Sequence, residues 1–381
     1  MNRNPGRGVG VGWVVFGLSP NPPGRAWALV WFGLLALFGV GCSPSTLVAR
    51  TLRVAPNRVP EFAKPSAPVI LRWPGGLLER FPSGTNEVGH PAVPLYWRII
   101  EPADYGLTLS LSNQVSAGRT NHEFSFRFRL PKEGLPPARP ALGTVFLIHG
   151  YGVDGDALFP WGLYLAEAGW RTVMMDLRGH GSSGGRRVTF GVLETNDLRC
   201  LKESLERSGR IAGPYVALGH SLGASLAVRW QAVDPSIRAS VALGAYAGFE
   251  NAVVRLRDGY ARWVPRAWAR GAAQRLPGLL GVEKEALDTD AAMRGRSLTV
   301  FFVAGWGDVV TPPEDSGELR NLAGGGSGFL IVAPASHEML PYLFPDHGRP
   351  VVDWLAAGPW CLSAGSVVAA EARESGGGNS R

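Results

Sequence analysis

The chain contains little cysteine, little lysine and little charge. Of its 381 residues, 18% are charged and three are cysteines, Cys42, Cys200 and Cys361. Three cysteines are too few for a disulfide framework, and their spacing suits no metal site. A single disulfide bond between Cys200 and Cys361 is an alternative in an oxidising compartment. Lysine and arginine together number 38, of which four are lysine and 34 arginine, and no basic run contains interleaved aromatic residues. The formal net charge of +7 therefore indicates no nucleic-acid partner, and it is compatible with a weak attraction to anionic membrane surfaces.

Hydrophobic residues, glycine and proline are abundant instead. The hydrophobic content of 45% is enough for a sizeable core, and 51 Gly and 30 Pro predict many turns rather than a helical bundle. A chain of 381 residues can hold one large domain or two small ones.

One long apolar run lies near the N-terminus, at residues 26–41, and follows three arginines. A run of this length suits the apolar part of a signal peptide but is shorter than the about 20 residues that cross a bilayer comfortably. Cys42, directly after this run, resembles the lipidated cysteine of a bacterial lipoprotein signal, although Gly39 stands where that signal usually has Leu. We therefore expect a signal or anchor at 1–41 and a membrane-attached protein of the bacterial cell envelope. An uncleaved anchor, plain secretion to the periplasm and a later start codon are the alternatives.

The rest of the chain divides by its hydrophobic pattern. Residues 42–93 are rich in Pro, Arg and Gly and show no sustained period, so we expect a linker or an irregular extension. Between residues 94 and 360, apolar runs alternate with helix-length segments, which predicts an α/β domain whose mostly parallel sheet is flanked by helices. Buried strands are expected at 144–148, 172–175, 215–218, 240–243, 298–304 and 329–332, and helices at 156–168, 195–208 and 222–232.

Three further segments have distinct patterns. Residues 124–130 alternate apolar and polar side chains, which predicts an antiparallel strand near a sheet edge that can pair with residues 95–100. Residues 247–296 are too long for a structureless connection, so we expect a small helical cap over the sheet. The tail at 361–381 has the composition of a disordered segment.

A nucleophile-elbow pattern occurs at Gly219-His220-Ser221-Leu222-Gly223, between a predicted strand and a predicted helix. In a G-x-S-x-G turn of this kind the serine hydroxyl is exposed above the sheet edge. The flanking glycines let neighbouring backbone pass without a clash against a Cβ atom. Ser221 is therefore the candidate nucleophile.

A serine nucleophile needs a base and a group that orients the base. His337 follows the last predicted strand and Asp308 the strand before it, so both fall at the sheet edge where Ser221 lies. Taken alone, an aspartate such as Asp308 is more often a turn or cap residue, and a histidine such as His337 is more often a satisfied core or surface residue. Asp315 and Asp290 are alternative acids. The arrival of all three in the order Ser, Asp, His, each after a strand, predicts a catalytic triad.

The oxygen of a tetrahedral intermediate needs two hydrogen-bond donors. We expect one to be the backbone N–H of Leu222, at the start of the helix after the elbow. The second is expected from the backbone N–H of Tyr151, in the glycine-containing loop after the strand 144–148. His149 in the same loop is expected to fix the loop rather than to act as a second base.

Residues from about 140 to 360 resemble the α/β-hydrolase superfamily, and within it the monoacylglycerol-lipase and lysophospholipase-like group. The matching pieces are His149-Gly-Tyr-Gly152, Asp176-Leu-Arg-Gly-His-Gly-Ser182, the elbow pentapeptide, Gly307-Asp308 and His337. Ala224 stands where the group often has Gly, and the first 93 residues have no counterpart in it.

The resemblance implies that Ser221 attacks an ester carbonyl and forms an acyl-enzyme, with His337 as base and then acid and Asp308 holding its tautomer. It implies no metal and no organic cofactor. We therefore expect a serine hydrolase of small-molecule esters, lipid-like or otherwise apolar. A serine peptidase or amidase of the same fold is the alternative, and a non-enzymatic binding scaffold is a third hypothesis that the complete triad disfavours.

Overall fold

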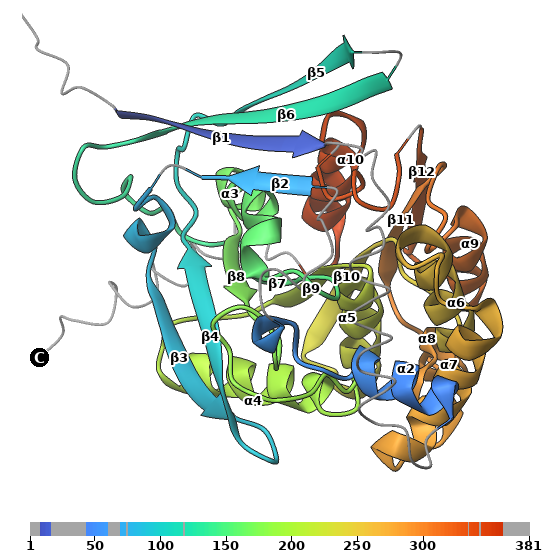
Figure 1. Ribbon diagram of the computed structural model, residues 1–381. Helices are drawn as coiled ribbons and strands as arrows, with labels where there is room; N and C mark the ends of the chain where they lie inside the picture. The colour runs from blue at the N-terminus through green and yellow to red at the C-terminus, as the bar shows by residue number, and fades with distance from the viewer. Residues whose placement is uncertain are drawn as a thin grey trace, which may run out of the picture.

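The computed structural model describes residues 8–16, 43–59, 69–73, 75–116, 119–333, 335–342 and 344–360 (Figure 1). The apolar run 26–41, the candidate lipidation site Cys42 and the tail 361–381 lie outside the described residues. The expectations for these three segments therefore stay predictions.

An eight-stranded sheet with strand order β12-β11-β10-β9-β7-β8-β4-β3 forms the centre of the molecule. The strands from β12 to β8 are parallel, and β4 and β3 are antiparallel to their neighbours at one edge. The bounds are β3 Ser83–Val88, β4 Val93–Ile100, β7 Thr144–Ile148, β8 Arg171–Met175, β9 Tyr215–His220, β10 Ile237–Leu243, β11 Val300–Gly305 and β12 Gly328–Val332. The predicted mostly parallel α/β sheet is confirmed, and each of the six predicted runs lies in or overlaps one strand.

Helices cover both faces of this sheet, because its inner strands are apolar on both sides. Along β7, Val145 and Leu147 join the core cluster of α3 and α10, whereas Phe146 and Ile148 join the cluster of α4 and α5 on the opposite face. The bounds are α3 Phe159–Glu167, α4 Glu194–Arg207, α5 Leu222–Val233, α9 Pro313–Leu322 and α10 Phe344–Ala357. The three predicted helices are confirmed as α3, with the short helix η4 (Gly155–Leu158) before it, α4 and α5.

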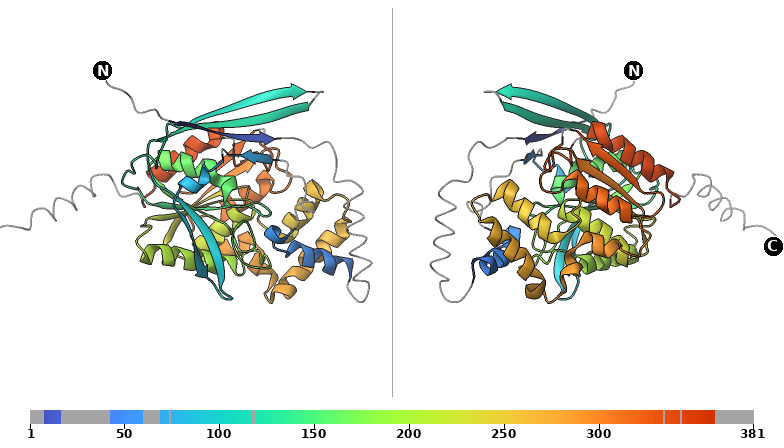
Figure 2. Two further views of the ribbon diagram at one scale, coloured as in Figure 1. Left: turned by 60° about the vertical axis from the view of Figure 1, so that its left-hand side comes forward. Right: turned by 90° about the vertical axis from the view of Figure 1, so that its right-hand side faces the viewer.

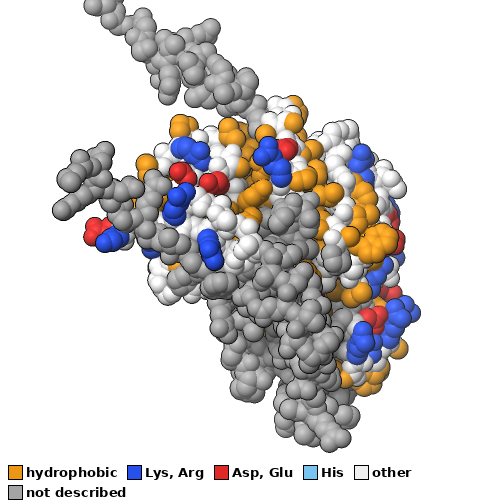
Figure 3. All heavy atoms as spheres, turned by 90° about the horizontal axis from the view of Figure 1, so that it is seen from above, with side chains coloured by type: hydrophobic (Ala, Val, Ile, Leu, Met, Phe, Trp, Pro, Cys, Tyr) orange, Lys and Arg blue, Asp and Glu red, His pale blue; other side chains and the backbone are white. Residues whose placement is uncertain are grey.

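A second sheet, with strand order β2-β1-β6-β5, lies on the side of α3 and α10 (Figures 1 and 2). Its strands are β1 Gly8–Phe16, β2 Val69–Arg72, β5 Thr108–Ser116 and β6 Arg119–Leu130. Phe126 and Phe128 of β6 are buried in the core cluster of α3, which attaches this sheet to the domain. In Figure 3, which views this side, basic and acidic side chains of the described residues are interspersed among hydrophobic ones.

Residues 124–130 form an antiparallel strand as predicted, but the predicted partner is wrong. Residues 95–100 belong to β4, which pairs with β3 and β8 in the central sheet. The last four residues of β4 are all buried, so this strand requires cover on both faces, which the central sheet provides. The expected position of residues 124–130 near a sheet edge is also wrong. These residues belong to β6, which pairs with β1 on one side and with β5 on the other.

The segment 42–93, expected to be a linker or an irregular extension, contains regular elements. They are α2 Pro44–Leu52, η1 Pro56–Arg58, β2, η3 Leu78–Arg80 and β3. Because β3 pairs with β4 from Ser83 to Val88, the central sheet begins before the expected domain boundary at residue 94. The residues of this edge strand are mostly polar, so no apolar run reveals it in the sequence.

The segment 247–296, where we expect a cap, contains α6 (Phe249–Tyr260), α7 (Arg266–Leu280), η5 (Lys284–Leu287) and α8 (Thr289–Met293). Helices α7 and α2 lie side by side (Figure 2). They approach so closely that a Cβ atom on Gly271 would lie 2.5 Å from Ser45 Oγ. Within the described ranges, no helix combines the length and the apolar character that a membrane crossing requires.

Candidate active site

Ser221 lies at the sharp turn between β9 and α5, with φ of 56° and ψ of −119°. A non-glycine residue with positive φ is strained, and such strain is characteristic of a nucleophile elbow. The flanking positions need glycine, because a Cβ atom on Gly219 would lie 2.1 Å from Gly223 O, and one on Gly223 would lie 2.0 Å from Ile148 O. This turn therefore requires glycine at positions 219 and 223.

The structure brings the side chains of Ser221, Asp308 and His337 together. His337 Nε2 lies 2.9 Å from Ser221 Oγ, and His337 Nδ1 lies 2.7 Å from Asp308 Oδ2. Asp308 follows β11 and His337 follows β12, so three parallel strands deliver the three residues to one edge of the sheet. Ser221 is partly exposed while Asp308 and His337 are buried.

Besides its contact with His337, the Asp308 carboxylate accepts three further hydrogen bonds. Its Oδ1 accepts hydrogen bonds of 2.8 Å from the backbone N–H groups of Val310 and Thr311, and its Oδ2 accepts one of 2.8 Å from Thr311 Oγ1. Burial by itself raises the pKa of Asp308, but the nearby His337 and these hydrogen bonds lower it, and the net pKa lies below the ordinary value. The carboxylate is therefore ionised and fixed in orientation. Thr311 was not among the residues expected from the sequence, although its place three residues after an aspartate is typical of a side-chain turn.

His337 combines burial with a strong charged partner. Burial lowers its pKa, but the Asp308 carboxylate raises it by more, so the net pKa lies above the ordinary value of 6.5. The neighbouring His220 behaves in the opposite way. Its ring centroid lies 4.8 Å from that of His337, and burial lowers its pKa to about 3. His220 is therefore neutral and donates from Nε2 to the His337 carbonyl oxygen at 3.0 Å, which leaves His337 as the imidazole of this pair that can accept a proton.

The loop after β7 approaches the elbow closely. A Cβ atom on Gly150 would be in contact with Ser221 Cβ at 3.4 Å. His149 donates from Nδ1 to Gly150 O at 2.7 Å and accepts at Nε2 from the Leu177 backbone at 2.9 Å, and burial lowers its pKa to about 4. These bonds fit the supporting role expected for His149, since both ring nitrogens are occupied.

The two expected oxyanion donors flank Ser221 on neighbouring segments. Leu222 begins α5, and Tyr151 follows Gly150 in the β7 loop. Within the described part of the chain, neither backbone N–H has a hydrogen-bond acceptor. Both groups are thus available to a bound oxygen atom.

The other candidates from the sequence have different partners. Asp315 forms two hydrogen bonds, of 2.9 and 2.8 Å, with the Arg255 guanidinium, and Asp290 is paired with Arg294. Neither therefore takes the place of Asp308 beside His337. Cys200 is a free thiol on α4, and Cys361 lies outside the described residues.

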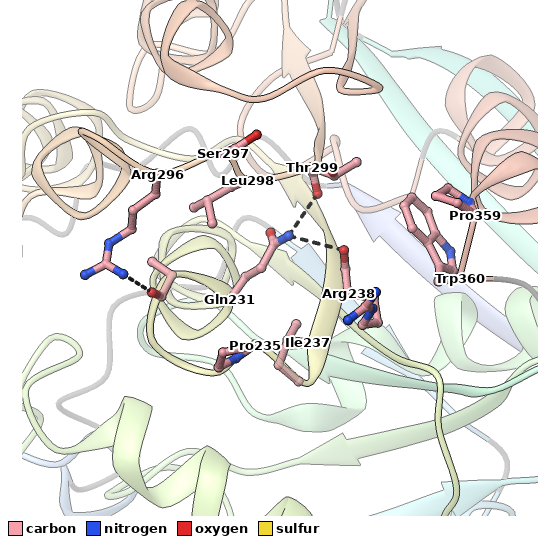
Figure 4. A pocket seen from close by; sticks show the side chains of 11 residues that line it. Gln231, Pro235, Ile237, Arg238, Arg296, Ser297, Leu298, Thr299, Pro359 and Trp360 are labelled. Carbon is pink, nitrogen blue, oxygen red and sulfur yellow. Dashed lines mark hydrogen bonds between the residues drawn. The ribbon is translucent and has the colours of Figure 1, made fainter.

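A cavity of about 410 Å³ lies at the opposite end of the strands, where β10 and β11 begin (Figure 4). Two of its polar lining side chains, those of Gln231 and Arg296, donate hydrogen bonds to backbone carbonyl groups. Gln231 Nε2 donates to Arg238 O and Thr299 O, and Arg296 donates to Ala232 O at 2.6 Å. This cavity is separate from Ser221, which follows the carboxyl end of β9.

Comparisons with known proteins agree with this architecture. The structure superimposes on an esterase from Pyrococcus furiosus with a TM-score of 0.54 and 18% identity, over 76% of this chain and 95% of that chain. A second crystal form of the same esterase gives a TM-score of 0.53 over the same shares. The chain therefore has the α/β-hydrolase fold.

The sequence comparisons define the relationship further. Residues 139–299 match the family described as serine aminopeptidase, S33. Over 201 residues the chain is 28% identical to a monoacylglycerol lipase of Mycolicibacterium smegmatis, which covers 50% of this chain and 65% of that protein. The chain thus matches slightly less than two thirds of that relative's length.

Proposed function

We propose that this protein is a serine hydrolase that cleaves carboxylic esters with apolar acyl groups through an acyl-enzyme. The observation that carries the proposal is the chain of two hydrogen bonds from Ser221 Oγ to His337 and from His337 to Asp308, of 2.9 and 2.7 Å. The similarity to an esterase and to a monoacylglycerol lipase supports an ester as the substrate.

The geometry suits the following steps. His337 Nε2 takes the proton of Ser221 Oγ as this oxygen attacks the ester carbonyl, and the imidazolium is stabilised by Asp308. The negative oxygen of the tetrahedral intermediate accepts hydrogen bonds from the backbone N–H groups of Tyr151 and Leu222. The imidazolium then donates its proton to the departing alcohol. Water, activated by the neutral imidazole, hydrolyses the acyl-enzyme and restores Ser221.

The preference for apolar acyl groups is supported by the aromatic side chains beside the elbow. Tyr151 stacks on Phe190 with ring centroids 5.9 Å apart, and Phe190 lies 5.1 Å from Phe249 of the cap helix α6. Leu222 belongs to the same cluster. An acyl chain bound to Ser221 beside this cluster would be removed from water, which favours apolar over charged substrates.

Labelling with a fluorophosphonate probe tests the proposed nucleophile. We expect the wild-type chain to be labelled and Ser221→Ala to be unlabelled. Ser225→Ala is the matched control, because Ser225 lies one turn further along the same helix and outside the triad. Equal labelling of wild type and Ser221→Ala would contradict the proposal.

A serine peptidase is the second candidate, because the family that residues 139–299 match is described as an aminopeptidase. The same triad cleaves esters and amides, so only turnover separates the two. We expect medium-chain nitrophenyl esters to be hydrolysed with a higher kcat/KM than aminoacyl anilides. The reverse order would favour the peptidase.

We also propose that the protein is attached to the membrane of the bacterial cell envelope by a lipid on Cys42. The support is the sequence pattern of residues 26–42 alone. The wild-type protein is expected in the detergent phase of a phase-separation experiment and Cys42→Ser in the aqueous phase. Detergent partitioning of Cys42→Ser would favour an uncleaved anchor.

A further inference from the structure

The first residues of the described chain after the signal-like segment lie against the proposed oxyanion loop. We call residues 43–57 the N-terminal strap; they comprise Ser43, α2 and the five residues after it. The residues of this strap have no counterpart in the α/β-hydrolase resemblance, and the family match begins only at residue 139. Nevertheless, the strap contacts three separate parts of the site region.

The first contact is with Tyr151. The Tyr151 hydroxyl donates a hydrogen bond of 3.1 Å to the backbone carbonyl oxygen of Leu52. Burial raises the pKa of Tyr151 to about 12, so the hydroxyl keeps the proton that this bond needs. The Tyr151 ring also stacks on Phe190. The ring is therefore fixed between the strap and an aromatic side chain, which restricts the movement of the Tyr151 backbone, whose N–H is the proposed oxyanion donor.

The second contact is with the cap. The Arg53 guanidinium donates a hydrogen bond of 2.8 Å to Leu279 O at the end of α7. Val48 and Leu52 of the strap and Leu279 of α7 pack against the same core cluster as Tyr151. Arg53, the residue that follows Leu52, thus connects the strap to the cap helix α7.

The third contact is with the loop after β8. Val188 N donates to Arg53 O at 2.9 Å, and Val54 forms an antiparallel bridge with Arg187. The Asn57 side chain donates to Gly181 O and Ser183 O at 3.1 and 2.8 Å. Arg53 is thus bonded through its side chain to α7 and through its carbonyl group to the loop after β8. These bonds fix the position of the strap.

We infer that the N-terminal strap is a positioning element of the active site, which holds Tyr151 so that its backbone N–H can bind the oxyanion. This inference rests on the proposed function. Leu52 acts through its carbonyl group and Arg53 through the cap, and neither touches the reacting atoms.

The test compares full-length Tyr151→Phe and Arg53→Ala with the wild type. Tyr151→Phe removes a single oxygen atom and keeps the ring. Its kcat for a nitrophenyl ester is expected to fall about tenfold with KM within about twofold, because the lost positioning affects the transition state more than the bound substrate. The affinity for an alkyl boronic acid, which forms a tetrahedral adduct on serine, should fall by the same factor. Arg53→Ala should lower both quantities by about threefold.

Arg58→Ala is the matched control. Arg58 lies directly after the strap and its side chain bonds to Gly185 O. Among the described residues it forms no hydrogen bond with Tyr151 or α7, so kcat should be unchanged. The inference would be overturned if Tyr151→Phe had a kcat and a boronate affinity within twofold of wild type. A lower Tm with unchanged kinetics would also overturn it, because the strap would then have a stabilising role only.

Hydrogen exchange separates this inference from the proposed function. The amides of residues 149–155 should exchange faster in Tyr151→Phe and Arg53→Ala than in Arg58→Ala, whether or not the protein hydrolyses esters. Unchanged exchange in this loop would contradict the strap's role. Absence of labelling at Ser221 in the wild type would instead contradict the hydrolase.

Discussion

The two ends of the central sheet differ in what their polar side chains bond to. At the carboxyl ends of the strands, Ser221, Asp308 and His337 bond to one another, and Ser221 stays partly exposed. At the amino ends, Gln231 and Arg296 bond to backbone carbonyl oxygens around the cavity. The first arrangement places an acid–base pair beside a partly exposed hydroxyl group, whereas the second joins helix α5 to the segments around it. The two clusters therefore differ in what their polar groups bond to, side chains at one end of the sheet and backbone carbonyl groups at the other.

Of the substitutions at the two ends of the central sheet, Ser221→Ala should lower activity the most. We expect kcat to fall by about 10⁴-fold or more, because the nucleophile is lost while the binding surface remains. The measurement is ester hydrolysis with the protein free of contaminating esterase. A fall of less than tenfold would mean that another residue attacks the substrate.

Asp308→Asn should have the next largest effect, a fall in kcat of about 10³- to 10⁴-fold. The amide cannot stabilise the imidazolium and favours the wrong tautomer of His337. Asp315→Asn is the comparison, because Asp315 binds Arg255 rather than His337. Similar kinetic losses in the two variants would show that charge near the sheet edge, and not the contact with His337, matters.

Activity should decline toward acidic pH with a midpoint above 6.5. The net pKa of His337 is raised above 6.5, and only the neutral imidazole can accept the serine proton. Well below that pKa, kcat/KM should fall about tenfold per pH unit. The raised pKa also stabilises the folded protein, by an amount that is full below pH 6.5 and is lost as pH rises through the folded pKa. A pH profile of kcat/KM checks the expected midpoint of activity, and an acid limb centred below 6.5 would contradict it.

Thr311→Val should have a smaller effect. It removes the hydroxyl bond to Asp308 Oδ2 but leaves the two backbone bonds to Oδ1. A hydrogen bond worth about 1 kcal/mol corresponds to a fall in kcat of about fivefold. Steady-state kinetics at a pH above the acid limb measures it. Unchanged kcat would show that the backbone alone orients the carboxylate.

Gln231→Ala should leave kcat unchanged within twofold and should lower stability. Gln231 bonds to two backbone carbonyl groups and accepts from Ser240 Oγ at 2.9 Å, so its loss leaves buried polar groups without partners. The free energy of unfolding should fall by about 1–3 kcal/mol. Urea denaturation and ester kinetics together test this, and a kinetic loss would remove the distinction between the two ends of the sheet.

Strong local signals in the sequence identified most of the central sheet. The run 144–148 coincides with β7, and the helix predicted at 222–232 is α5 within one residue. These segments are apolar on both faces or are bounded by glycine-rich turns, so neighbouring residues already specify them. The edge strand β3 was missed because it is polar, and the wrong partner for 124–130 arose because register and pairing depend on residues distant in the chain.

The candidate triad could be read from the sequence because each member follows a strand in a known order. The supporting residues could not. Thr311 beside Asp308 and the neutral His220 beside His337 are ordinary residue types without a pattern of their own. Their contribution depends on distances that arise only when β9, β11 and β12 lie side by side.

By itself, the sequence determined the elbow, because the positive φ of Ser221 and the close backbone contacts at Gly219 and Gly223 are properties of a few consecutive residues. It also determined the alternation of strand and helix through local hydrophobicity. Only the tertiary structure decided that Asp308 rather than Asp315 faces His337, and that the strap reaches Tyr151, about a hundred residues further along the chain. Contacts between residues so distant in the chain are set by how whole elements pack, and local hydrophobic patterns carry no information about them.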